Sequence, residues 1–185
     1  QDCTFRGCET ALRVTAAARA DAKRCVATGP GGVAYEFSGS SLKLHRCDAT
    51  GFDRAVVAKR GRLRVSRGTW SDCRVGLFAT GNADVRAHTT RIKASTDAGV
   101  AAKGHSTVHL RDVRVEGSSG NGLEAVEAAT LHAKRGTVEA TSATLLAMHA
   151  GQLSLDGTTL GGTPEWAAYA DAVAHIDPGD AALPP

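Results

Sequence analysis

Cys47-Asp48-Ala49-Thr50-Gly51 is the stretch that decides the fold, because the chain repeats it at a fixed interval. Cys25-Val26-Ala27-Thr28-Gly29 stands 22 residues earlier, and Cys3-Thr4-Phe5-Arg6-Gly7 stands 22 residues before that. The same position, which we call the slot, recurs in weaker form at steps of 21 to 23 residues, beginning at Gly68, Thr90, Val113, Gly136 and Thr158. A constant period in the twenties indicates a solenoid, in which one structural unit stacks on copies of itself.

Each period contains three short apolar groups. In the third coil they are Leu42 and Leu44, then Cys47 and Ala49, then residues 55–57. The first two groups alternate in steps of two, which is the period of a strand with one buried face. Turn-forming residues such as Gly81-Asn82 separate the groups. Three strands per coil leave no room for a crossover helix, so the sequence predicts an all-β parallel β-helix of about eight coils.

This pattern resembles the right-handed parallel β-helix of the pectate-lyase-like superfamily, over essentially residues 1–170. The resemblance implies coils of about 22 residues over 1–163, and we expect 164–185 to form a C-terminal cap and tail. In this interpretation Trp166, Tyr169 and Ile176 fold over the last coil. At the other end the repeat already runs at Cys3, so we expect an upstream domain or a second chain to cover the first coil.

Composition narrows the class of protein. The 185 residues are 42% hydrophobic and 4% aromatic, with a net charge of +3, and no apolar run approaches the length of a membrane span. The five cysteines form no C-x-x-C motif, and the compartment stays open. Cys3, Cys25 and Cys47 share the slot, so we expect them to stack inside as a ladder of small apolar thiols. Disulfides or soft-metal ligands are the alternative interpretation of this ladder.

Basic residues recur at two outward positions, four and two residues before the slot. The predicted binding residues are Lys43, His45, Arg64, Arg86, His88, His109, Arg111, His132 and Lys134. Parallel stacking would place them on one sheet face, with like charges about 5 Å apart, which costs stability. A column that tolerates this repulsion is a candidate site for an anionic partner, either an acidic polysaccharide or another protein. The alternative is a solubilising face whose Arg and Lys stems lie over the sheet.

Signals for catalysis are weak. Pectate lyases of this fold use clustered acidic calcium ligands with a basic proton acceptor, whereas here only Glu116 and Glu139 share a column. Arg91-Ile92-Lys93 and Gly104-His105-Ser106 resemble two polygalacturonase motifs, but in reversed order and without the paired aspartates. Three surface histidines, His88, His109 and His132, could take a transition metal, yet no carboxylate occupies the same columns in these coils.

The remaining signals concern cofactors and sugar platforms. No phosphate-binding or dinucleotide-binding motif is present, so no cofactor is expected. Phe52, Trp70 and Trp166 are the candidates for exposed aromatic platforms, although Trp70 occupies an inward slot and should be core. The sequence therefore favours a non-catalytic interaction or scaffold module that binds an anionic partner through the basic face. The alternatives are a polysaccharide lyase or hydrolase domain and a segment of a phage-tail or cell-surface adhesin.

Overall fold

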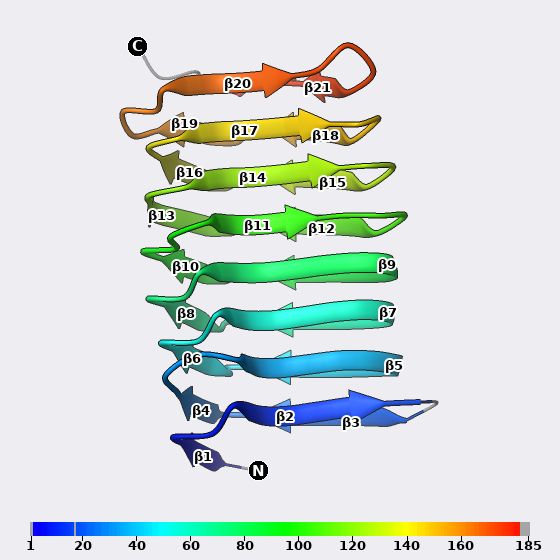
Figure 1. Cartoon of the computed structure of the whole chain (residues 1–185), viewed down its shortest axis with the longest axis vertical. Coiled ribbons are helices and arrows are strands. Elements are labelled where there is room, and N and C mark those ends of the chain that lie inside the picture. Colours follow the sequence, from blue (N-terminus) through cyan, green and yellow to red (C-terminus); the bar gives the residue numbers. More distant parts are fainter. Residues whose placement is uncertain (1, 17, 182–185) are drawn as a thin grey trace.

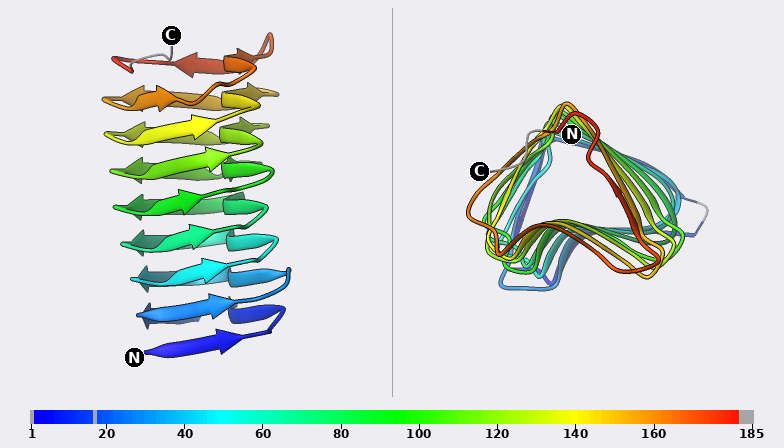
Figure 2. Two further views of the ribbon diagram at one scale, coloured as in Figure 1. Left: turned by 90° about the vertical axis from the view of Figure 1, so that its left-hand side faces the viewer. Right: turned by 90° about the horizontal axis from the view of Figure 1, so that it is seen from above.

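In a computed structural model, which describes residues 2–16 and 18–181, the chain is a parallel β-solenoid whose coils stack along one axis (Figure 1). The described residues form strands and turns and no helix, and successive coils are spaced by about 22 residues, which confirms the predicted all-β fold. Seen along the axis, each coil traces a rounded triangle, so the rod has three faces (Figure 2).

The first face is a sheet of eight short parallel strands that carry the slots. Its strands are β1 (Cys3–Arg6), β4 (Cys25–Thr28), β6 (Asp48–Thr50), β8 (Thr69–Ser71), β10 (Arg91–Lys93), β13 (Arg114–Ser118), β16 (Thr137–Ala140) and β19 (Thr159–Gly161). Ala49 pairs with Trp70, and Trp70 pairs with Ile92 in the next coil. The slots predicted from the sequence therefore lie directly above one another.

The second and third faces belong to one sheet of 13 strands that bends between them. Three strands cross the bend without interruption, namely β5 (Val33–His45), β7 (Arg54–Ser66) and β9 (Val75–His88). Elsewhere the second face consists of β2 (Thr10–Thr15), β11 (Ala98–Ala102), β14 (Asn121–Val126), β17 (Ala143–Met148) and β20 (Trp166–Ala170). The third face continues with β3 (Arg19–Lys23), β12 (Thr107–Arg111), β15 (Thr130–Lys134), β18 (Gln152–Asp156) and β21 (His175–Asp177).

The interior is narrow and closely packed. Trp70, Tyr35 and Phe37 are fully buried, and Trp70 Nε1 donates a hydrogen bond of 3.2 Å to the Cys47 carbonyl. The sequence-based assignment of Trp70 to the core is confirmed. Phe52 is only 2% exposed, so its candidacy as an exposed aromatic platform was wrong. Its ring fills the corner beside Gly29, where an added Cβ would lie 2.6 Å from the ring.

The cysteine ladder is present at the start of the rod. Cys3 pairs in register with Cys25, and the Cys25 thiol also interacts with Cys47 in the following coil. All five cysteines are free thiols. Burial, followed by the neighbouring thiols Cys47 and Cys3, raises the pKa of Cys25 to about 11. Burial also raises the pKa of Cys47, so at neutral pH Cys25 and Cys47 are protonated and act as small apolar filling.

The corner between the third and first faces has an unusual backbone. In seven consecutive coils the residue just before the slot has a positive φ, between 50° and 58°. These residues are Arg24, Arg46, Arg67, Thr89, Asp112, Arg135 and Gly157. Six of the seven are not glycine, although this left-handed conformation normally costs other residues about 1–2 kcal/mol. The solenoid sustains it because each corner N–H bonds to the next coil, as Arg67 N does to His88 O at 3.1 Å.

The two ends of the described rod differ from its middle. Inward side chains of the first coil, such as Phe5 and Leu12, are only partly buried, whereas their partners Ala27 and Tyr35 in the next coil are 0% exposed. At the other end, β20 and β21 pair in parallel with β17 and β18 and so extend the second and third faces. Trp166 and Tyr169 are 54% and 43% exposed, so the prediction that they fold over the last coil was wrong.

Candidate anion-binding face

The third face brings the predicted basic residues together. Lys43, Arg64, Arg86, His109 and His132 occupy one column of directly paired positions through β5, β7, β9, β12 and β15. His45, His88, Arg111 and Lys134 lie in the second column, where Ser66 takes the position between His45 and His88. All nine side chains are at least partly exposed, and neighbouring coils are about 4.8 Å apart. The register of both columns is therefore as the sequence predicted.

Five of the nine residues line one shallow groove in the N-terminal half of this face. It has a volume of 440 Å³ and is lined by Asp21, Lys23, Lys43, His45, Arg64, Arg86 and His88, with Leu44, Val65 and Ser66 completing it. Lys43 and Arg64 have no ion pair within the described chain, because no carboxylate of the described residues lies within 4.0 Å of their charged nitrogens. This third-face groove is therefore the part of the column with the least internal neutralisation.

Carboxylates neutralise other parts of the face, a feature that the sequence analysis missed. Asp84 lies 3.6 Å from Arg86 and 3.5 Å from Arg62 of the preceding coil. Asp156 pairs with Lys134 in the last third of the rod. The signal was available in principle, because Asp84 precedes Arg86 by two residues and so points to the same side of its strand.

Two histidines form a stacked pair further along the face. The His109 and His132 rings lie 5.0 Å apart at an interplanar angle of 14°, and His132 Nδ1 is hydrogen-bonded to Ser154. Burial lowers the pKa of His109, and the neighbouring His132 and Arg86 lower it further. His109 is therefore predominantly neutral at physiological pH, and this part of the face gains positive charge only in acid.

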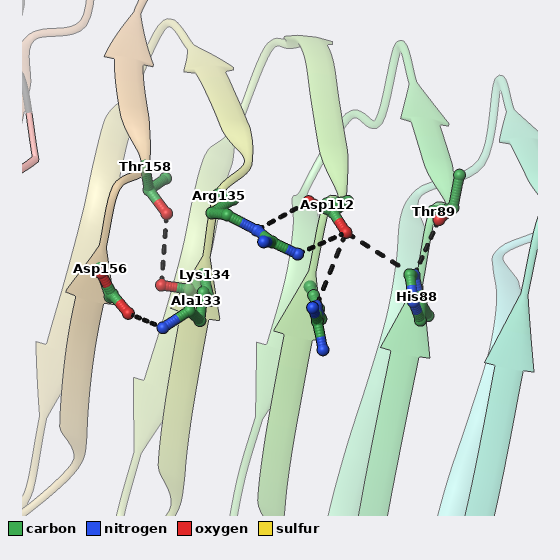
Figure 3. A network of polar contacts seen from close by, with 9 residues as sticks. His88, Thr89, Asp112, Ala133, Lys134, Arg135, Asp156 and Thr158 are labelled. Atoms are coloured by element: carbon green, nitrogen blue, oxygen red, sulfur yellow. Dashed lines mark hydrogen bonds and ion pairs between the residues drawn. The ribbon is translucent and has the colours of Figure 1, made fainter.

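A third histidine takes part in a network around Asp112, at the corner beside the third face (Figure 3). His88 Nδ1 is 2.7 Å from the Thr89 hydroxyl and 3.9 Å from an Asp112 oxygen. Hydroxyl and carboxylate thus face the same ring nitrogen, whereas a proton relay needs them on opposite nitrogens. Asp112 instead accepts two hydrogen bonds of 3.2 Å from Arg135. The arrangement orients cations and lacks the geometry of an activated nucleophile.

The remaining catalytic candidates are dispersed. Glu116 lies 3.4 Å from Arg91 and 4.0 Å from Lys93, so its carboxylate is held between two cations. Its expected neighbour Glu139 pairs with Gly161 of β19, and the register between β13 and β16 shifts just after Val115. Among residues 2–16 and 18–181, no three His, Cys, Asp or Glu side chains are grouped so as to hold a metal ion.

A scan of protein-family models, a search of curated proteins and a search of solved structures each gave no match. Within the described residues, no helix is long and apolar enough to cross a membrane.

Proposed function

We propose that this chain is a non-catalytic β-solenoid module that binds an anionic partner, either an acidic polysaccharide or the acidic surface of another protein, through its third face. The observation that carries the proposal is the stack of Lys43, Arg64 and Arg86, three cations on directly paired positions of consecutive strands. Only Arg86 has a carboxylate within ion-pair distance among the described residues. The right-handed sense of the coil and a place in the pectate-lyase-like superfamily belong to the same proposal and rest on the 22-residue period.

The shape of the face suits an elongated partner. The third-face groove runs across the strands, parallel to the rod axis, because its residues come from consecutive coils. Cations repeated about every 4.8 Å along this axis can follow a linear polyanion, and each added contact strengthens the attraction. Most of the cationic side chains here are exposed, so single pairs are weak and affinity depends on several acting together.

Reversal of the central charges tests this function. We expect the wild-type protein to be retained on immobilised polygalacturonate, and Arg64→Glu with Arg86→Glu to elute at much lower salt. Arg60→Ala is the matched control, because Arg60 is an exposed arginine with no ion pair in the described chain and lies outside the groove lining. Equal retention of the double variant and the wild type would contradict the proposal.

A second element of the proposal is that an upstream domain or another chain covers the first coil. It is supported by the partial exposure of inward residues such as Phe5, Leu12, Ala20 and Ala22. Their counterparts one coil later are almost fully buried, which indicates an apolar surface suited to a further layer. A protein beginning at Gln1 that remains a stable monomer in size-exclusion chromatography would contradict this element.

A further inference from the structure

A second groove, distinct from the third-face groove, follows the corner between the third and first faces. It has a volume of 510 Å³. Two rows of side chains from four consecutive coils form it. The row before the slot contains Arg67, Thr89, Asp112 and Arg135, and the row after it contains Thr69, Arg91, Arg114 and Thr137. We call this hollow the corner groove, and none of its eight side chains belongs to the nine predicted binding residues.

The slot residues between the two rows add little bulk to the groove, because Thr90 and Val113 are buried. Gly68 and Gly136 have no side chain, and Thr90 turns its hydroxyl to the His88 carbonyl at 3.2 Å. Close stacking of the coils requires this at Gly136, where a Cβ would lie 2.4 Å from the Val113 carbonyl oxygen. The corner groove is therefore a consequence of how the coils pack, and the residues that line it belong to strands and hydrogen-bonded corners.

Four guanidinium groups and one carboxylate line the groove. Asp112 is shared among Arg135, with two hydrogen bonds of 3.2 Å, Arg111 at 3.7 Å and His88 at 3.9 Å. Figure 3 shows Arg135 reaching across to Asp112 of the previous coil. Arg135 is therefore fixed in place, and the single negative charge of the lining is more than balanced by its neighbours.

Two of the other three arginines are available to bind a ligand. The Arg67 and Arg114 side chains make no ion pair or hydrogen bond with the described residues, and both are exposed. Arg91 is engaged with Glu116 at 3.4 Å. Arg67 and Arg114 belong to coils two steps apart, about 10 Å along the axis. A ligand that engages both must carry at least two anionic groups at that separation.

The lining also indicates the chemical class of the ligand. Thr69 and Thr137 line the same wall as Arg91 and Arg114, and the Thr89 hydroxyl on the other wall lies 2.7 Å from His88 Nδ1. A phosphate or sulfate group has three terminal oxygens and can accept hydrogen bonds from more directions than a planar carboxylate can. The guanidinium group of arginine can donate two parallel hydrogen bonds to such a group. The lining contains no aromatic side chain, whereas single-stranded nucleic acids bind largely by stacking bases on aromatic rings.

From these observations we infer that the corner groove binds a polyol bearing several phosphate or sulfate esters, with Arg67 and Arg114 as its two anchoring residues. Ester oxygens accept from the guanidinium groups, and ring hydroxyls pair with the threonines. The volume lies within the usual range for small-ligand sites, about 300–1,000 Å³. This inference goes beyond the proposed function, because it concerns another surface and another ligand class.

The test measures affinity for two probes at about 150 mM salt, where long-range attraction is screened. A heparin octasaccharide represents sulfate esters and myo-inositol hexakisphosphate represents phosphate esters, each titrated by isothermal calorimetry. We expect at least one probe to bind, and Arg67→Ala with Arg114→Ala to weaken it at least about tenfold. Arg67→Lys with Arg114→Lys keeps the charge but loses the fork, so we expect an intermediate loss.

Controls separate this site from general attraction and from the third-face groove. Arg60→Ala should change affinity less than about twofold, and Arg64→Glu with Arg86→Glu should weaken these probes less than the double alanine variant does. Circular dichroism verifies that each variant is folded. Equal losses from Arg60→Ala, no loss from the double alanine variant, or tighter binding of a single-stranded RNA decamer than of both probes would overturn the inference. Loss only in the third-face variant would do so too, while supporting the proposed function.

Discussion

The second and third faces of the rod are formed by the same bent sheet, but their charges are arranged in opposite ways. On the second face, Glu36 lies between Arg13 and Lys59 of the adjacent coils, at 2.6 Å from each, and its side chain is only 12% exposed. On the third face, Lys43, Arg64 and Arg86 follow one another without a carboxylate between them. The second-face carboxylate pairs with a cation from each neighbouring coil, whereas the third-face cations stack directly on one another.

This difference indicates which charged residues stabilise the fold. Opposite charges on directly paired strands stabilise a sheet by about 0.2–1 kcal/mol per pair, and like charges destabilise it by a similar amount. The second face uses the favourable arrangement, and a cation–π contact lies nearby, where Arg54 Cζ is 4.4 Å from the centre of the Phe78 ring. The third face departs from it at positions where alternation would be just as easy to build, which is why we assign its cations to binding.

The largest expected effect is on the second face. Lys59→Glu places a second carboxylate beside Glu36 and should lower the free energy of unfolding by about 1–2 kcal/mol, measured by urea denaturation. Half of the Lys59 side chain is in water, which limits the loss. The variant should still bind polygalacturonate as the wild type does. A loss of affinity as large as that of the third-face variants would remove the distinction between the two faces.

The stability of the Lys59→Glu variant relative to the wild type should depend on pH. Hydrogen bonding to Lys59, supported by Arg13, lowers the pKa of Glu36. A lowered pKa in the folded state stabilises the protein above the ordinary pKa, and this contribution is lost as the pH falls through the lowered value. The stability difference between Lys59→Glu and the wild type should therefore shrink below about pH 4.

A smaller effect is expected at the stacked histidines of the third face. A bound anion favours protonated His109, so the affinity for a polyanion should rise about threefold to tenfold between about pH 8 and pH 5.5. Arg86 and His132 oppose this protonation and Asp84 favours it. His109→Gln with His132→Gln should give a smaller rise in the same titration. A rise of the wild-type size in this variant would show that the histidines do not carry the pH dependence.

Acid pH should have the opposite effect on the stability of the unliganded protein. Because the pKa of His109 is lowered in the folded state, protonation favours the unfolded chain. The unliganded protein should therefore lose stability as the pH falls below the ordinary value of 6.5, and the glutamine variant should lose less.

In a solenoid, residues one period apart in the sequence lie directly above one another in neighbouring coils. The period of the sequence therefore predicted the fold. Once Cys25 and Cys47 stand 22 residues apart, the positions of Arg64 above Lys43 and of Arg86 above Arg64 follow. Both basic columns of the site could therefore be derived from spacing alone.

The corner groove could not be derived in this way. Its walls depend on a left-handed corner at Arg67, Thr89, Asp112 and Arg135, of which only Asp112 is a residue type that favours this conformation. The contact between Asp112 and Arg135 joins side chains of adjacent coils, and it forms only if these side chains extend toward each other along the rod axis. At the C-terminal end, the expected cap region 164–185 contains β20 and β21, which continue the second and third faces.

The most direct test of the central claim is the effect of Arg64→Glu on stability at low salt. The substitution places a carboxylate between Lys43 and Arg86, so the column alternates in sign, and it should raise the free energy of unfolding by about 0.5 kcal/mol. The gain should decrease as salt is added, because both neighbours are exposed. A loss of about 1 kcal/mol or more would contradict the account, since it would show that the stacked cations stabilise the fold.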